Sequence, residues 1–227
     1  MSTQTEAGAS GPSTPKERGL RLVPVLLVLT AVSGMIDAVS YLGLGHVFTA
    51  NMTGNVVVLG FAATGAPGFS VPHTLTSLGC FVTGAAAGGR VAARLAGGPR
   101  RTWARLTLAT EATLLTASAV VAFAAPDATA TVYALIAVTA LAMGFRNATV
   151  RRLGVPDLTT TVLTMTLTGL AADGPGTRSV RRTAAVAAMV AGAALGAWLV
   201  RDHGLGLPLL VAAVVVGLLA VLTSGRE

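Results

Sequence analysis

Eight apolar segments follow one another along the chain and predict a bundle of membrane helices. They run approximately over 22–41, 48–65, 72–96, 104–125, 130–148, 157–172, 182–200 and 206–223. A helix needs about 20 mostly apolar residues, within a range of roughly 17–25, to cross a bilayer. Six segments are long enough, whereas the second and sixth are apolar only over a short stretch. The sequence therefore predicts an all-α, polytopic membrane helix bundle with about six transmembrane helices.

The second and sixth segments are polar where they begin. The second opens Phe48-Thr-Ala-Asn-Met-Thr-Gly-Asn55, and the sixth opens Asp157-Leu-Thr-Thr-Thr-Val-Leu-Thr164. Asn and Thr groups that face lipid are costly unless they are paired. Non-helical backbone at membrane depth is tolerated only where protein covers it or where it lines a watery cavity. These segments are expected to be short re-entrant half-helices that enter the membrane and return on the same side.

The two halves of the chain share a sequence pattern. Gly34-x-x-Asp37-Ala38 recurs 110 residues later as Gly144-x-x-Asn147-Ala148, and Gly84-x-x-x-Gly88 recurs 108 residues later as Gly192-x-x-x-Gly196. Leu42-Gly43 and Met52-Thr53 also have counterparts in the same order, 111 residues later. We interpret residues 21–125 and 126–224 as two membrane repeats of one integral membrane domain, after a tail over 1–20.

Composition and charge agree with a membrane protein. Only 11% of residues are charged, against about 25% in soluble domains, and mean hydropathy is +0.73. A charged fraction this low excludes a soluble globular enzyme, a disordered tail protein and a nucleic-acid-binding domain. The Ser-, Thr-, Gly- and Pro-rich tail is expected to be disordered.

The formal charge of +7 is interpreted as a topology signal, because cytoplasmic loops of membrane proteins collect Lys and Arg. If all eight segments cross and the N-terminus is inside, seven Lys and Arg residues lie inside and nine outside. If the second and sixth only re-enter, Arg146 and others move inside, and Arg201 alone stays outside. The second arrangement inverts one repeat relative to the other and places both termini in the cytoplasm. Inverted repeats with broken helices are typical of solute transporters.

Asp37 is the first candidate for chemistry, since an intramembrane carboxylate is a functional candidate by default. It could bind a cation, relay a proton or orient the first re-entrant segment; the alternative is a purely structural hydrogen bond to that segment. Asn51, Thr53, Gly54 and Asn55 form the densest polar cluster. They are interpreted as a substrate or ion site, with a helix cap as the alternative.

The second half supplies the counterparts of these residues. Asn147 stands where the first half has Asp37, and Thr164 and Thr166 belong to a threonine-rich run that also includes Thr159, Thr160 and Thr161. Arg90 and Glu111 are expected to form a structural ion pair across the bundle, rather than a coupling site, because a lone charge there is expensive.

Enzyme motifs are missing from the sequence. There is no HExxH, no G-x-S-x-G and no P-loop, and the three His residues lack metal-ligand spacing. The protein is therefore expected not to be an enzyme and to need no metal or other cofactor. Its expected partners are the lipid bilayer and a small-molecule or ion substrate, with no nucleic acid; stripes of small residues permit a homo-oligomer.

At these residues the sequence resembles a known family. The stretches Gly34-Met-Ile-Asp37-Ala-Val-Ser-Tyr41-Leu-Gly43 and Phe48 to Asn55 resemble the YoaK-like family of bacterial multi-pass membrane proteins, a domain of unknown function. The resemblance covers roughly 20–223; Thr164-Met165 replaces the family's usual second Thr-Gly step. It implies an inner-membrane protein with about six spans and implies no substrate or activity.

The sequence as a whole favours a small-solute transporter or channel of the bacterial inner membrane. The re-entrant segments would build its central site, and Asp37 would bind a cation or proton. The alternative is a non-transporting multi-pass membrane scaffold or signalling protein.

Overall fold

The computed structural model of the chain describes residues 22–95, 100–126, 128–153, 163–173 and 176–223. Within these ranges the chain forms helices joined by turns, without a strand. The helices are α1 (Leu22–Gly43), α2 (Met52–Ala63), α3 (Val71–Arg94), α4 (Arg100–Ala124), α5 (Thr129–Leu153), α6 (Leu163–Ala172), α7 (Thr177–His203) and α8 (Gly206–Leu222). The prediction of an all-α fold is confirmed for the described part of the chain. The tail over 1–20 lies outside it.

Four of these helices are long and apolar enough to cross a membrane, over Val23–Gly43, Thr102–Ala124, Thr129–Arg152 and Thr177–His203. They are α1, α4, α5 and α7. At a rise of about 1.5 Å per residue, each exceeds the hydrocarbon thickness of about 30 Å. The described chain thus has the helices of a membrane protein.

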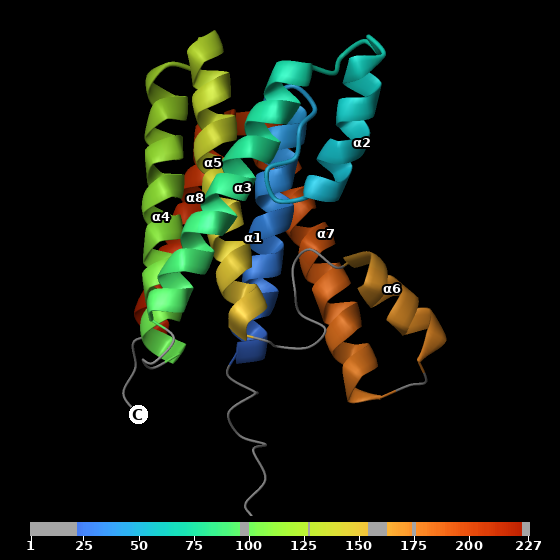
Figure 1. The fold of residues 1–227 in the computed structure, drawn as a ribbon, viewed down its shortest axis with the longest axis vertical. Helices are drawn as coiled ribbons and strands as arrows, with labels where there is room; N and C mark the ends of the chain where they lie inside the picture. Colours follow the sequence, from blue (N-terminus) through green and yellow to red (C-terminus); the bar gives the residue numbers. More distant parts are fainter. Residues whose placement is uncertain (1–21, 96–99, 127, 154–162, 174–175, 224–227) are drawn as a thin grey trace, which may run out of the picture.

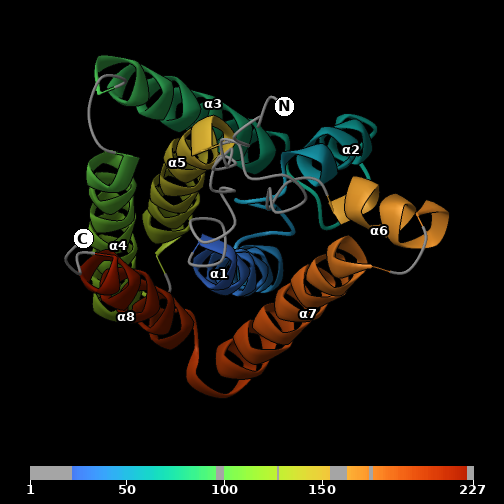
Figure 2. The ribbon, with the colours of Figure 1, turned by 90° about the horizontal axis from the view of Figure 1, so that it is seen from below.

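Helix α1 lies at the centre of the bundle. Seen from below, the other long helices surround it (Figure 2). Its residues Leu26, Ile36 and Val39 are almost fully buried and join the same apolar core as Leu135 of α5 and Leu209 of α8. The residues that a central site would use on α1 are therefore held by packing on most sides.

Two helix pairs, α1 with α7 and α3 with α5, approach each other most closely through glycines. A Cβ atom on Gly192 of α7 would collide with the backbone of Ala31 on α1. A Cβ on Gly84 of α3 would likewise collide with the backbone of Leu141 on α5. Small residues at these positions let two helix backbones come into contact, as is common in membrane bundles.

The short helices α2 and α6 occupy opposite halves of the bundle's height (Figure 1). Helix α1 ends and α3 begins at the upper end of Figure 1, and α2 runs from mid-height back to that end. Helix α5 ends and α7 begins at the lower end, and α6 runs from mid-height to that end. The starts of α2 and α6 therefore come close together at mid-height.

Candidate functional site

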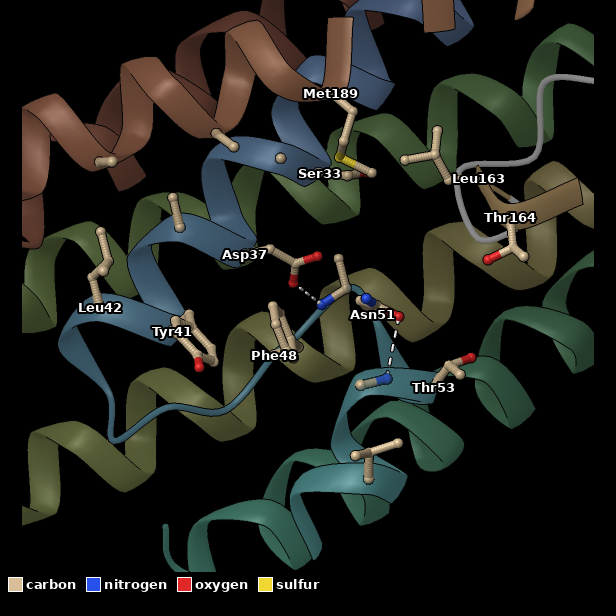
Figure 3. A pocket seen from close by; sticks show the side chains of 17 residues that line it. Ser33, Asp37, Tyr41, Leu42, Phe48, Asn51, Thr53, Leu163, Thr164 and Met189 are labelled. Carbon is tan, nitrogen blue, oxygen red and sulfur yellow. Dashed lines mark hydrogen bonds between the residues drawn. The ribbon is translucent and has the colours of Figure 1, made fainter. Parts of the chain in front are cut away.

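A cavity of about 660 Å³ lies where the starts of α2 and α6 meet the centre of the bundle (Figure 3). One wall is α1, with Ser33, Asp37 and Tyr41. The other walls are the segment before α2, the first turns of α2 and α6, and small residues of α7 such as Ala193. Segments from both halves of the chain thus line one partly open space of a size typical of ligand sites.

Asp37 holds the segment that precedes α2. Its Oδ1 atom accepts hydrogen bonds from the backbone N–H groups of Thr49 at 3.2 Å and Ala50 at 2.8 Å. The N–H group of Asn51 adds to this interaction. The carboxylate also lines the cavity and is only half-buried. Asp37 therefore orients the segment, as one of the sequence-based alternatives proposed, and still faces the open space.

Asn51 caps helix α2. Its Oδ1 accepts a hydrogen bond from the backbone N–H of Gly54 at 3.4 Å, so the predicted alternative of a helix cap is confirmed. Asn51, Thr53 and Gly54 also line the cavity. A Cβ on Gly54 would meet the ring of Phe48, which explains why a residue without a side chain stands there. The start of α2 thus presents polar groups and an aromatic wall to the cavity.

Asn55 has a different role from its neighbours. Its side chain is fully buried. The Oδ1 atom accepts a hydrogen bond from the Phe48 N–H at 2.8 Å, and the Nδ2 atom donates to the Phe48 carbonyl at 2.6 Å and to the Ser77 hydroxyl at 3.0 Å. Ser77 in turn donates to the same carbonyl at 2.6 Å. Asn55 does not line the cavity. It fixes the chain reversal before α2 against helix α3, so its action on any ligand would be indirect.

The candidates of the second half divide in the same way. Thr164 lines the cavity together with Leu163, at the start of α6. Thr166 is buried, Asn147 is half-buried on α5, and neither lines the cavity. Thr159, Thr160 and Thr161, which the sequence also suggested, lie outside the described residues.

A buried ion pair lies close to this site. The Glu111 Oε1 atom of α4 is 2.8 Å from Nη1 of Arg146 on α5, and both side chains are almost completely buried. Arg146 also donates to the hydroxyl of Ser33 on α1 and acts electrostatically on Asp37. The pair therefore connects α4 with α5 and, through Ser33, with α1 at a residue that lines the cavity.

The prediction that Arg90 pairs with Glu111 is wrong. Arg90 is exposed on α3, whereas Glu111 faces α5 and has Arg146 as its partner. The same observation corrects the charge count, which placed Arg146 among the cytoplasmic arginines, because its side chain is only 1% exposed. A signal for this was present, since Arg146 adjoins Asn147, the counterpart of Asp37, and therefore lies at a similar depth.

Aromatic side chains complete the cavity and were missed by the sequence analysis. The rings of Tyr41 and Phe48 stack with centroids 4.9 Å apart, and both residues line the space. In the described ranges, no group of three His, Cys, Asp or Glu residues that could hold a metal ion occurs. The arrangement can bind a small molecule through hydroxyls, amides, one carboxylate and aromatic faces.

Comparison with known proteins gives two matches and one negative result. A family model described as "Protein of unknown function (DUF1275)" matches residues 25–222. The UPF0700 transmembrane protein YoaK of Bacillus subtilis (strain 168) is 38% identical over 152 residues. That alignment covers 65% of this chain and 64% of the length of the relative. No solved structure matches the chain.

Proposed function

The chain belongs to the DUF1275 family of membrane proteins, and we propose that it is a transporter or channel that carries a small solute across the bacterial inner membrane. The observation that carries the proposal is the cavity between the starts of α2 and α6. The starts of α2 and α6 that line it lie at mid-height in Figure 1, and the lining comes from both halves of the chain and contains a carboxylate among polar groups. Transporters bind substrates in this way at the midplane, between the ends of broken helices.

The proposal includes six spans and two re-entrant segments. Besides the four long apolar helices, α3 and α8 would cross, and α2 and α6 would not. In support, α1 ends and α3 begins at the same end of the bundle, with α2 returning to that end from mid-height (Figure 1). Two N-terminal helix ends would then point into the membrane centre, where their positive dipole ends and the first-turn N–H groups that no cap occupies would be available to a ligand.

An inverted repeat is supported by matched contacts. Gly34 of α1 packs against Met189 of α7, and Gly144 of α5 packs against Phe81 of α3. These contacts are related by the offsets that the sequence pattern suggested, 110 for α1 to α5 and 108 for α3 to α7. An odd number of spans in each half gives the second half the opposite orientation, which would allow the cavity to open alternately to the two sides.

Charge supports an orientation with the lower end of Figure 1 in the cytoplasm. Six arginines lie near the ends of helices at this lower end: Arg94, Arg105, Arg151, Arg152, Arg178 and Arg181. Arg201 lies at the opposite, upper end of α7. Cytoplasmic ends of membrane proteins collect arginine. Both termini would then be cytoplasmic.

The test of transport is solute flux into liposomes that contain the purified protein. Light scattering would follow the volume of the liposomes after they are mixed with glycerol, urea, ammonium acetate or sodium acetate. Thr53→Trp would place a large side chain at the cavity, whereas Val56→Trp would place it on the 63% exposed, apolar side of the same helix. We expect protein-dependent flux of at least one solute, at least about tenfold lower with Thr53→Trp and nearly unchanged with Val56→Trp.

Equal flux in both variants would contradict the assignment of the cavity as the pathway. Absence of protein-dependent flux for every solute would favour the alternative of a non-transporting scaffold or signalling protein.

A further inference from the structure

The charges around the cavity do not balance in the described structure. Glu111 and Arg146 form a buried pair and neutralise each other. Asp37 lines the cavity beside them and would leave one uncompensated negative charge when it is ionised. A net charge at this depth is expensive, so an ionised Asp37 favours a positively charged ligand.

The surroundings of Asp37 suit a proton better than a metal ion. Metal cations need several oxygen ligands, about six in the case of Mg²⁺ or Ca²⁺. Asp37 is instead surrounded by N–H donors, because Thr49 and Ala50 donate to Oδ1. Several nearby oxygens are already engaged: Glu111 Oε1 and the Ser33 hydroxyl hold Arg146, and the Asn51 amide oxygen caps α2. The second carboxylate oxygen, Oδ2, can still take a proton.

The titratable and charged groups that face Asp37 are few in the described chain. They are Tyr41 on its own helix α1, Arg146 on α5 and, through Arg146, Glu111 on α4. Helices α2, α6 and α7 contribute no titratable side chain to the cavity lining that the structure describes. Asn147 stands at the corresponding position of the second half and cannot titrate. A change in protonation at this site therefore centres on Asp37.

We infer that the ion that couples to the proposed transport is a proton, and that Asp37 binds and releases it. This inference rests on the proposed function. The proton comes from water in the cavity, binds Oδ2 and leaves later to the opposite side, so no other reactant is needed. Protonation removes the negative charge from the acceptor of the Thr49 and Ala50 N–H groups. Charge-assisted hydrogen bonds are about twice as strong as neutral ones, so the segment before α2 is held less tightly when Asp37 is neutral.

The test measures the position of α2 as a function of pH, without a substrate. Two nitroxide spin labels are attached in the full-length chain with Cys80→Ala, one at Thr53 on α2 and one at Thr116, which is exposed on α4. Pulsed electron resonance gives the distance between them in lipid nanodiscs. We expect the distance distribution to change between about pH 8 and about pH 4, a range that spans carboxyl titration. A control pair at Leu75 of α3 and Thr116 should stay constant.

Asp37→Asn, which keeps the shape but loses the charge, should give the low-pH distribution at both pH values. An unchanged distribution in the labelled chain with Asp37 intact would overturn the inference, and so would a pH response that persists in Asp37→Asn. Replacement of choline by Na⁺ at constant pH should have no effect; a response to Na⁺ would overturn it in favour of a metal cation. The measurements on the labelled chain with Asp37 intact do not depend on the Asp37→Asn variant, so they decide even if that variant does not fold.

The two proposals can fail separately. Flux without a pH response of α2 would support the proposed transport and contradict the proposal that Asp37 binds the coupling proton. A pH response of α2 without flux for any solute would keep the proton site and reject transport.

Discussion

At the residue scale, the effect of a buried charge on stability depends on its partner. Arg146 would be prohibitively unstable alone in this core, yet it contacts the carboxylate of Glu111 and the hydroxyl of Ser33. Removal of one partner from a buried pair costs about 3–5 kcal/mol, whereas replacement of both by apolar residues is often neutral. We therefore expect the fold to be sensitive to the loss of one partner of the pair and tolerant of the loss of both.

The first prediction uses this asymmetry. Glu111→Leu should lower the free energy of unfolding by about 3–5 kcal/mol, because the Arg146 charge is left unpaired. Glu111→Leu combined with Arg146→Leu should recover most of that loss, since Ser33 keeps its hydrogen bond to the Leu29 carbonyl at 3.0 Å. Thermal unfolding in detergent, followed by tryptophan fluorescence, provides the comparison. A double variant less stable than Glu111→Leu would contradict the argument.

The second prediction separates two residues of one polar cluster. Asn55→Ala removes hydrogen bonds to Phe48 and Ser77 and leaves their buried groups unsatisfied, so it should lower the free energy of unfolding by about 1–3 kcal/mol. Thr53→Ala, at an exposed side chain, should change it by less than about 0.5 kcal/mol. The same unfolding assay measures both. Equal losses of stability would mean that Asn55 has no special structural role.

At the element scale, the predicted helices were placed well because apolar length is a local property. Helix α8 begins at Gly206, as expected from the apolar segment, and α1 begins at Leu22. The start of α2 was also suggested by its residues, since Asn51 is both a good cap and a polar group in an apolar segment. The choice of Arg90 as partner of Glu111 failed because the pairing depends on how α4 turns toward α5, and composition carries no information on that rotation.

The third prediction concerns the close contact of α3 and α5. Gly84→Val would force a side chain into the backbone of Leu141 and should lower the free energy of unfolding by at least about 1–3 kcal/mol. Gly79 lies on the same helix with open space around it, so Gly79→Val is the matched control and should fold normally. Retention of the folded protein after detergent extraction, measured by size-exclusion chromatography at increasing temperature, distinguishes them. Similar profiles for both variants would argue against a tight α3–α5 contact.

At the scale of the whole molecule, the sequence predicted the parts of the candidate site but only some of its geometry. Asp37, Asn51 and Thr164 were singled out as polar residues in apolar segments, and they line one cavity. Tyr41 and Phe48 were not singled out, although they also line it. The sequence alone does not distinguish an aromatic residue that faces a cavity from one that faces lipid. The position of a cavity depends on contacts between distant segments, which hydropathy does not report.

The last prediction tests the six-span topology, on which the proposed pathway depends. Single cysteines are placed in the Cys80→Ala background at Thr64 after α2, at Thr102 in α4 and at Asp202 near the end of α7. If α2 returns to the side on which it began, Thr64 and Asp202 should react with a membrane-impermeant thiol reagent in intact cells, and Thr102 only after lysis. If α2 and α6 both cross, Thr64 is protected and Thr102 reacts from outside, while Asp202 still reacts and serves as the positive control. The crossing result would reverse α3, α4 and α5 and leave most arginines of the first half outside the cell, against the usual charge distribution. It would also remove the structural basis for a solute pathway between two half-helices.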